Sequence, residues 1–150
     1  MMHEPGRGTK RRFPRLWSMN AVCIRSSDRD PAPPASILVV EDEVLVRSVV
    51  AMYLRDCGFQ VVEAGNADEA IRVLEAGLAV DIVFSDVNMP GSMDGFGLAA
   101  WLRLERPGLH LILTSGSPQK TADLGKHRPF LAKPYNHANL ERLIRTMLAE

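Results

Sequence analysis

Short apolar and β-branched runs alternate with helix-like segments from Ser36 to the C-terminus, and this pattern constrains the fold most. A strand, a helix and another strand form the repeating unit of a parallel sheet. The first run, residues 37–40, is apolar throughout, as expected of a strand that is covered on both faces. The sequence therefore predicts one α/β domain over residues 36–150, with a doubly wound, five-stranded parallel sheet.

Glycine, proline and capping residues set the expected boundaries. Gly58 and Gly77 are natural helix ends, and Asn66 with Glu69 three residues later resembles a capping pair that opens a helix. The final helix carries one apolar stripe at helical spacing. The predicted strands are 37–40, 59–64, 82–85, 109–113 and 130–132, and the predicted helices are 43–57, 66–77, 96–106 and a last helix with Leu140, Leu143, Ile144, Met147 and Leu148 on its stripe.

The first 35 residues differ from the rest in charge and composition. Seven Lys/Arg and three Asp/Glu give them a net charge of +4, so the balance of 18 basic and 18 acidic residues in the chain leaves −4 for residues 36–150. An acidic folded part argues against a DNA-binding surface. Glycines and prolines without periodicity predict a disordered basic tail over residues 1–35, and a mis-assigned start, with Met19 as the true one, is an alternative. So is a basic arm that touches nucleic acid or anionic lipid.

The chain has few features of an exported protein. Cys23 and Cys57 are too few for a disulfide framework and form no metal-binding spacing. The apolar stretch 16–24 is interrupted by polar residues and is far shorter than the about 20 residues of a membrane span. We expect a cytoplasmic protein with neither a nucleic-acid nor a membrane partner.

Charged and hydroxyl side chains follow four of the five predicted strands. Ligands of such sheets bind at the carboxyl ends of the strands, so these side chains are expected to converge. They are Glu41, Asp42 and Glu43 after the first strand, Asp86 after the third, Thr114 and Ser115 after the fourth, and Lys133 after the fifth.

This set of side chains suits phosphate chemistry with a hard cation. Carboxylates without His or Cys are typical of Mg²⁺, which keeps waters and phosphate oxygens in its shell. With Mg²⁺ and Lys133 screening its charge, the Asp86 carboxylate can attack phosphorus and form an acyl phosphate. Thr114 and Lys133 would then bind the phosphoryl oxygens.

Four segments in order resemble the receiver domains of bacterial two-component response regulators, from about Ser36 to the C-terminus. They are Ile-Leu-Val-Val-Glu-Asp-Glu at 37–43, Ser-Asp-Val-Asn-Met-Pro at 85–90 with Met-Asp-Gly at 93–95, Leu-Thr-Ser-Gly at 113–116, and Phe-Leu-Ala-Lys-Pro-Tyr at 130–135. The chain is most similar in organisation to single-domain, chemotaxis-type response regulators. The resemblance implies a flavodoxin-like strand order 2-1-3-4-5.

The resemblance also implies a role for each motif residue. Asp86 matches the phosphoacceptor, and Lys133 the lysine that pairs with phosphate, with a cis bond before Pro134. The resemblance implies Mg²⁺ as the cofactor, and a sensor histidine kinase or histidine phosphotransfer protein as the phosphodonor. Its metal ligands match Asp42 directly, Glu41 through water, Asp86, and the backbone carbonyl of Asn88. Its switch residues match Thr114 and Phe130.

Three departures from the family pattern affect how the protein is expected to signal to its downstream partner. The loop 89–95 is one residue longer than usual, and the interval between Thr114 and Lys133 is short, which predicts a short or irregular fourth helix. Phe130 lacks the hydroxyl of the more common tyrosine. We expect a monomer that is not an enzyme beyond slow self-phosphorylation and self-dephosphorylation, and that signals by binding an unknown downstream protein.

Other interpretations remain. The acidic residues after the first strand could simply open a helix, and Asp86 could be a turn former. A phosphohydrolase of the haloacid dehalogenase type also forms an aspartyl phosphate, but it needs a second Asp where Asn88 stands. A degenerate receiver could bind partners without phosphorylation. Phe96, Trp101, Met147 and Cys57 are interpreted as core residues, and the four histidines have no metal-ligand spacing.

Overall fold

The computed structural model describes residues 31–117 and 129–150. Most of the predicted basic tail lies outside the described residues. So does most of the segment expected to hold the short fourth helix between the last two strands. A compact unit spans Pro34–Glu150.

The described residues form a five-stranded, wholly parallel sheet in the order β2-β1-β3-β4-β5. This confirms the predicted fold class and strand order. The strands are β1 (Ser36–Val40), β2 (Gln60–Ala64), β3 (Ile82–Asp86), β4 (His110–Ser115) and β5 (Phe130–Ala132), and the helices are α2 (Val44–Asp56), α3 (Ala67–Glu75), α4 (Gly95–Glu105) and α5 (His137–Leu148).

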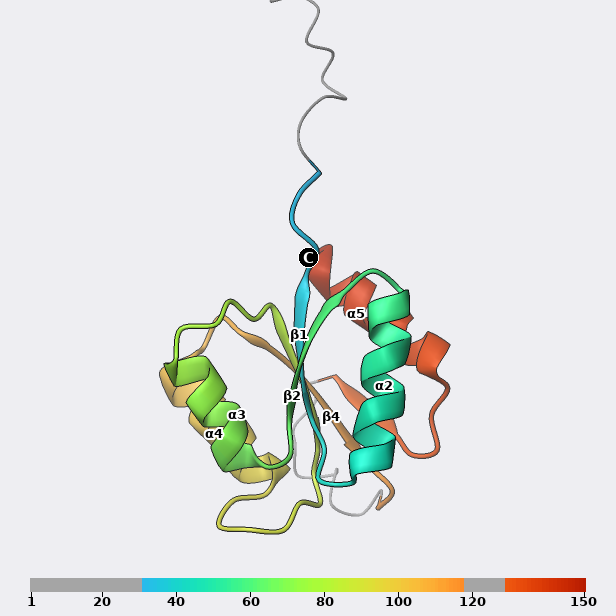
Figure 1. The fold of residues 1–150 in the computed structure, drawn as a ribbon. Coiled ribbons are helices and arrows are strands. Elements are labelled where there is room, and N and C mark those ends of the chain that lie inside the picture. The colour runs from blue at the N-terminus through green and yellow to red at the C-terminus, as the bar shows by residue number, and fades with distance from the viewer. Residues whose placement is uncertain (1–30, 118–128) are drawn as a thin grey trace, which may run out of the picture. The chain divides into compact units, whose positions relative to one another are not determined.

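Helices cover both faces of the sheet, as Figure 1 shows, with α3 and α4 on one face and α2 and α5 on the other. The side chains of β1 alternate between two apolar clusters. Leu38 and Val40 pack toward α3 and α4, whereas Ile37 and Val39 pack toward α2 and α5. Both faces of the central strands are therefore buried, which explains why these strands are apolar at nearly every position.

The predicted boundaries agree with the observed ones to within about two residues, the usual uncertainty of helix ends. Asn66 caps α3 by accepting from the Glu69 amide at 2.8 Å. Gly58 and Gly77 follow α2 and α3 with positive φ. β4 is longer than predicted because Thr114 and Ser115, whose polarity suggested a strand end, pair with Leu131 and Ala132 of β5.

Several smaller expectations can be compared with the structure. The bond between Lys133 and Pro134 is cis, as predicted. Met147 is buried, but Phe96, Trp101 and Cys57 are only half-buried at the margins of the two clusters. Among the described helices, none has the length and apolar character that crossing a bilayer requires.

Candidate functional site

Asp86 ends the central strand β3 and is only 6 % exposed. Its backbone pairs with Thr114 of β4. Gly95, at the start of α4, lies against this strand end so closely that a Cβ there would collide with the Asp86 carbonyl and come 2.7 Å from the Val87 Cα. The Gly95 amide also donates to the Val87 carbonyl at 2.9 Å. The loop after β3 is thus packed directly onto the residue that carries the carboxylate.

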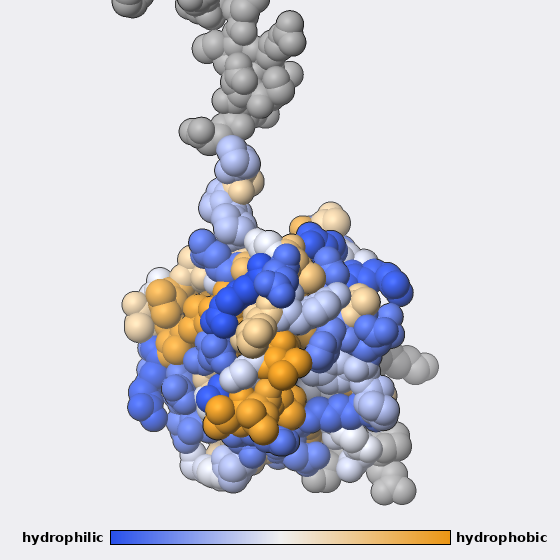
Figure 2. All heavy atoms as spheres, turned by 45° about the vertical axis from the view of Figure 1, so that its right-hand side comes forward, coloured by the Kyte–Doolittle hydropathy of each residue, from blue (hydrophilic) through white to orange (hydrophobic). Residues whose placement is uncertain are grey.

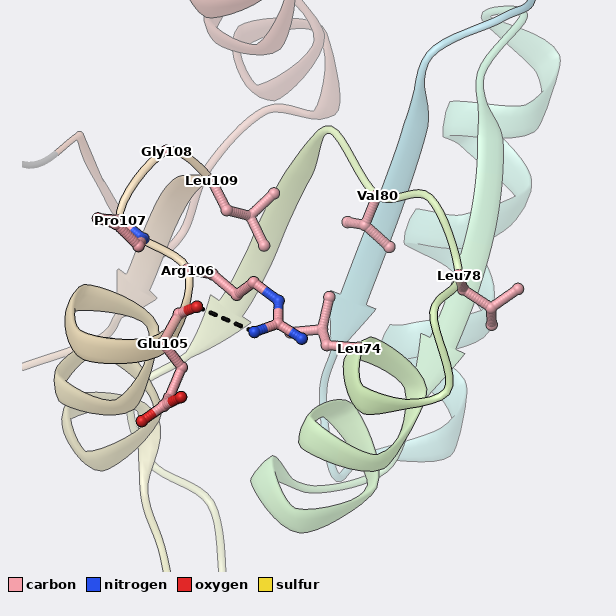
Figure 3. Close-up of a pocket in the computed structure, with 8 residues that line it drawn as sticks. All are labelled: Leu74, Leu78, Val80, Glu105, Arg106, Pro107, Gly108 and Leu109. Atoms are coloured by element: carbon pink, nitrogen blue, oxygen red, sulfur yellow. Dashed lines mark hydrogen bonds between the residues drawn. The ribbon is translucent and has the colours of Figure 1, made fainter.

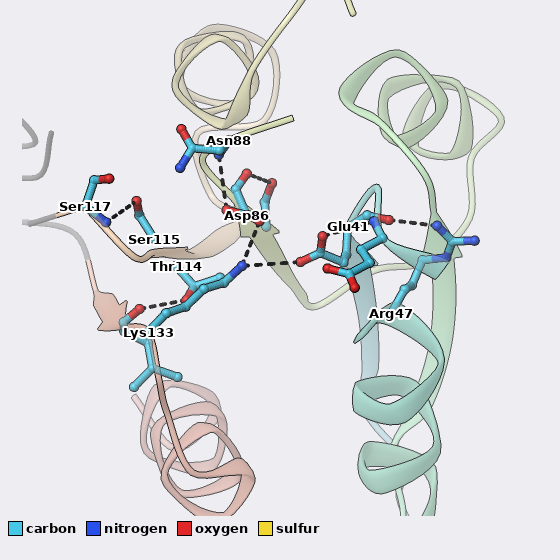
Figure 4. A network of polar contacts seen from close by, with 11 residues as sticks. Glu41, Arg47, Asp86, Asn88, Thr114, Ser115, Ser117 and Lys133 are labelled. Atoms are coloured by element: carbon cyan, nitrogen blue, oxygen red, sulfur yellow. Dashed lines mark hydrogen bonds and ion pairs between the residues drawn. The ribbon is translucent and has the colours of Figure 1, made fainter. Parts of the chain in front are cut away.

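Lys133, which follows β5, brings its ammonium group to two buried carboxylates (Figure 4). Its Nζ donates to Asp86 Oδ2 at 2.8 Å and lies 3.7 Å from Glu41 Oε2. Burial opposes the charge of Lys133, but the hydrogen bond and charge of Asp86 outweigh it and raise the pKa of the lysine. Lys133 therefore stays protonated as the counter-ion of the site.

Glu41 is the second buried carboxylate and is 7 % exposed. Its Oε1 accepts from the Glu43 amide at 3.1 Å, at the turn that opens α2. Burial raises the pKa of Glu41 to about 7, and the charge of Asp86 adds to the rise. Burial disfavours the charged carboxylate, and the nearby negative charge disfavours it further, so the Glu41 carboxyl is protonated more easily than an ordinary glutamic acid.

Asp42 completes a group of three carboxylates with Glu41 and Asp86. One oxygen from each lies within 4.8 Å of the others, and Asp42 is the exposed member. Nearby, the backbone N–H of Asn88 donates to Asp86 Oδ1 at 3.1 Å. A set of oxygen donors without nitrogen or sulfur fits a hard divalent cation, so the residues present suit Mg²⁺.

Thr114 lies in the buried wall beside Asp86, but its hydroxyl group is directed away from the carboxylate. The Thr114 Oγ1 donates to the Leu131 carbonyl at 2.7 Å, across the β4–β5 ladder (Figure 4). Phe130, the residue before Leu131, is half-buried against the α3–α4 side of the core. The structure thus brings together the carboxylates of Glu41, Asp42 and Asp86 and the ammonium group of Lys133. The Thr114 hydroxyl contacts β5 instead of Asp86, and Phe130 packs against the core.

Two residues near the site were missed in the sequence analysis. Arg47 of α2 donates to the Glu41 carbonyl at 2.7 Å. Tyr135, just after the cis proline, is half-buried, and burial with the charges of Glu41 and Asp86 raises its pKa to about 12. A cation one turn into the helix after the acidic pair was the available signal for Arg47.

A separate cavity of about 410 Å³ lies at the amino ends of β3 and β4, the edge of the sheet opposite Asp86 (Figure 3). Its walls come from the C-terminal ends of α3 and α4 and from the loops that follow them, and most lining residues are apolar, with Glu105 and Arg106 as the charged ones. None of the predicted site residues lines this cavity. The clustered carboxylates and Lys133 therefore mark the candidate site.

Comparison with known proteins identifies the family. The response regulator receiver domain family matches residues 37–145, and the chain belongs to it. The chain is 32% identical over 119 residues to the transcriptional regulatory protein PdtaR of Mycobacterium tuberculosis, an alignment covering 77% of this chain and 57% of that protein. It is 36% identical over 126 residues to the sensor kinase CckA of Brucella abortus, covering 79% of this chain and 13% of CckA. The chain thus spans less than two thirds of these relatives.

Solved receiver structures agree with the observed fold. A response regulator receiver protein from Sinorhizobium medicae superposes with a TM-score of 0.72 at 27% identity, covering 77% of this chain and 95% of that one. The response regulator TrrA of Thermotoga maritima, solved in complex with Mg(2+)-BeF, gives a TM-score of 0.68 at 26% identity. That superposition covers 75% of this chain and 98% of the TrrA chain. The chain is therefore a receiver domain of the two-component type, a family of signalling modules.

Proposed function

We propose that this receiver accepts a phosphoryl group onto the Asp86 carboxylate from a phosphohistidine donor. The observation that carries the proposal is the 2.8 Å contact between Lys133 Nζ and Asp86 Oδ2, at a strand end shared with two further carboxylates. In the transfer, an Asp86 oxygen forms a new P–O bond while the donor's P–N bond breaks. The electron pair of that bond returns to the imidazole nitrogen.

Residues around Asp86 have distinct roles in this proposal. Asp42, Asp86 and the Asn88 carbonyl would bind Mg²⁺ directly, and Glu41 through water. Bound there, Mg²⁺ supplies positive charge that offsets the carboxylates and the phosphoryl oxygens. Lys133 balances the same charge from the β5 side and binds a phosphoryl oxygen.

The conformational response in this proposal involves Thr114 and Phe130. The Thr114 hydroxyl turns from Leu131 toward the phosphoryl group, and Phe130 repacks inward. Phosphorylation thereby shifts an existing equilibrium between two conformations of the receiver.

The other two functions are less well supported. A phosphohydrolase of the haloacid dehalogenase type is not favoured, because Asn88 cannot serve as its general acid and the family is one of receivers. A receiver that is never phosphorylated is not favoured either, because its phosphorylation residues are all present. We propose that any catalysis is limited to slow self-phosphorylation and self-dephosphorylation.

Labelling from acetyl phosphate with Mg²⁺ tests the assignment of Asp86. We expect the wild type to form an acyl phosphate that hydroxylamine cleaves, and Asp86→Asn to form none. Asp94→Asn is the matched control, because Asp94 lies in the same loop but caps α4 by accepting from the Gly97 amide at 2.9 Å, and Asn retains this cap. Equal labelling of wild type and Asp86→Asn would exclude Asp86 as the acceptor.

We also propose that a sensor histidine kinase or histidine phosphotransfer protein is the donor and that it contacts α2 in the cytoplasm. Leu45, Val49 and Met52 lie on one face of α2, which begins just after Asp42, and are 75%, 52% and 62% exposed. Part of the apolar surface is visible in Figure 2, which brings the α2 side of the molecule forward. Exposed apolar side chains next to a reactive site are typical of a protein-binding surface.

Substitution on α2 separates donor docking from chemistry. Leu45→Ser should slow transfer from the cognate phosphohistidine protein while leaving labelling by acetyl phosphate unchanged. Leu104→Ser on α4 removes another highly exposed leucine, 79% exposed, and serves as the control. Equal transfer rates for wild type and Leu45→Ser would count against α2 as the docking surface.

We propose that the phosphorylated form stays monomeric and binds a different downstream protein. The short interval between Thr114 and Lys133, noted in the sequence, supports this proposal because it reduces the surface available for self-association. Light scattering with beryllofluoride, a stable phosphoryl mimic, should give the mass of a monomer. A shift to the mass of a dimer would contradict the proposal.

A further inference from the structure

Arg47 links the acidic turn after β1 to the edge strand of the sheet. Its Nη1 donates to the Glu41 carbonyl at 2.7 Å, and its Nε lies 3.6 Å from Glu63 Oε1 on β2 (Figure 4 shows the first contact). The Arg47 side chain is only 19% exposed. A charged donor on a carbonyl, shielded from water, makes a short and strong hydrogen bond.

The local backbone leaves room for this guanidinium group. A Cβ at Gly65 would lie 3.4 Å from Arg47 Nη1 and 3.2 Å from Glu69 Oε2. The Gly65 amide instead donates to Glu69 Oε2 at 2.8 Å. The residues between the end of β2 and the start of α3 thus pack closely against the Arg47 side chain.

The Glu41 carbonyl belongs to the same peptide unit as the Asp42 amide. Holding that carbonyl fixes the plane of the peptide, which includes the Asp42 nitrogen and Cα, and therefore restricts the directions in which the Asp42 side chain can leave the backbone. Asp86 and Glu41 are buried and held by their surroundings, whereas Asp42 is exposed. We therefore expect the orientation of the Asp42 carboxylate to depend on the backbone, whereas the orientations of Asp86 and Glu41 are also set by the side chains packed around them.

We propose that Arg47 is a positioning residue that orients Asp42 for metal binding through the Glu41 carbonyl. The inference rests on the proposed role of Asp42 as a ligand of Mg²⁺. Arg47 does not touch the cation or the phosphoryl group. Its loss weakens metal binding while the fold and the carboxylates stay in place.

Arg55 offers a matched control on the same helix. Arg55 Nη2 lies 3.0 Å from Glu63 Oε2, so both arginines of α2 pair with the same glutamate. Arg55 also donates to the Val61 carbonyl at 3.2 Å, which lies on β2 and not in the acidic turn. A purely structural role, pairing α2 with β2, is common to both residues, whereas the contact with the acidic turn belongs to Arg47.

The test is a Mg²⁺ titration of the full chain followed by amide NMR shifts, with thermal melting in EDTA. Arg47→Met keeps the apolar stem and should weaken Mg²⁺ binding about tenfold, as for loss of an outer partner of a metal ligand. Arg55→Met should leave the dissociation constant unchanged, and thermal melting in EDTA records how much stability each variant loses through its pairing with β2. Arg47→Lys should recover part of the affinity, because an ammonium group can donate to the carbonyl but lacks the planar fork.

Equal Mg²⁺ affinities for Arg47→Met and Arg55→Met would overturn the proposal, and so would a wild type that binds no Mg²⁺. If Arg47→Met fails to fold, Arg47→Gln takes its place, with Arg55→Gln as its control, since it also removes the guanidinium group that donates to the Glu41 carbonyl. Weaker metal binding in Arg47→Gln than in Arg55→Gln then supports the role, and equal binding overturns it. A wild type that binds Mg²⁺ but is not labelled by acetyl phosphate would refute phosphorylation at Asp86 without affecting the result for Arg47.

Discussion

The Thr114 hydroxyl donates a 2.7 Å hydrogen bond to the backbone carbonyl of Leu131. Thr114 is also the register partner of Asp86, so the same residue adjoins the proposed acceptor on one side and β5 on the other. The hydroxyl has one proton to donate. Turning the hydroxyl toward a phosphoryl oxygen therefore breaks its hydrogen bond to Leu131, the residue after Phe130 in β5. Phosphorylation of Asp86 would in this way alter the contacts of β5 beside Phe130.

Thr114→Val tests this exchange because valine keeps the shape and removes the donor. We expect beryllofluoride to bind Thr114→Val about tenfold more weakly, since a hydrogen bond to a charged acceptor contributes about 1.5–3 kcal/mol. Thr114→Ser keeps the hydroxyl and should bind nearly as the wild type does. Fluorine NMR titration measures both affinities, and equal binding by the valine and serine variants would show that the hydroxyl does not contact the phosphoryl mimic.

The sequence predicted the sheet and the identity of the clustered residues because both depend on short-range pattern. Apolar runs fix the strands, and the carboxyl ends of parallel strands necessarily share one edge. This argument predicts that Asp86, Glu41 and Lys133 lie close together, and it requires no knowledge of side-chain dihedral angles. The contacts that it missed depend on tertiary geometry.

Arg47 illustrates the part that could not be predicted. Its side chain reaches back over six residues to a carbonyl of the preceding turn and is held by a glutamate from a different strand. A pattern of residue types does not specify which of several acceptors a long, flexible cation will select. The direction of the Thr114 hydroxyl could not be predicted from the sequence either, because Thr114 pairs with both Leu131 and Asp86 on the neighbouring strands.

The two acidic residues after β1 should differ in their effect on Mg²⁺ affinity. Glu41 is buried and already accepts from the Glu43 amide, whereas Asp42 is exposed and can turn toward a cation. We expect Asp42→Asn to weaken Mg²⁺ binding more than Glu41→Gln does. Calorimetric titration that gives the reverse order would contradict the assignment of Asp42 as the direct ligand.

Gly95 and Gly97 provide a paired test of how the loop after β3 holds Asp86. A Cβ at Gly95 would meet backbone atoms of Asp86 and Val87, which cannot move without moving the strand end. A Cβ at Gly97 would meet the flexible side chain of Met93 instead.

Gly95→Ala should therefore lose about 2–3 kcal/mol of unfolding free energy, within the range for overpacking a core, while Gly97→Ala loses less. Urea unfolding measures both values. Slower labelling at Asp86 should accompany the change at Gly95. A similar, small loss in both variants would show that the strand end can shift to accept the extra carbon.

Lys133 is expected to stabilise the fold as well as the phosphoryl group. The side chains of Asp86 and Glu41 that it pairs with are 8% and 9% exposed, and the lysine itself is 32% exposed. Lys133→Met removes the cation and leaves two buried carboxylates facing each other. We expect a loss of about 2 kcal/mol in EDTA, below the range for a fully buried pair because Lys133 is partly solvated.

A second substitution distinguishes charge imbalance from lost packing. Adding Asp86→Asn to Lys133→Met removes one of the two unpaired carboxylates and should recover part of the lost stability. Packing loss alone would not be recovered, because Asn has nearly the shape of Asp and adds no contact to the side chain that replaces the lysine. Urea unfolding of the wild type, both single variants and the double variant completes the cycle, and a double variant no more stable than Lys133→Met would contradict an electrostatic role for the lysine.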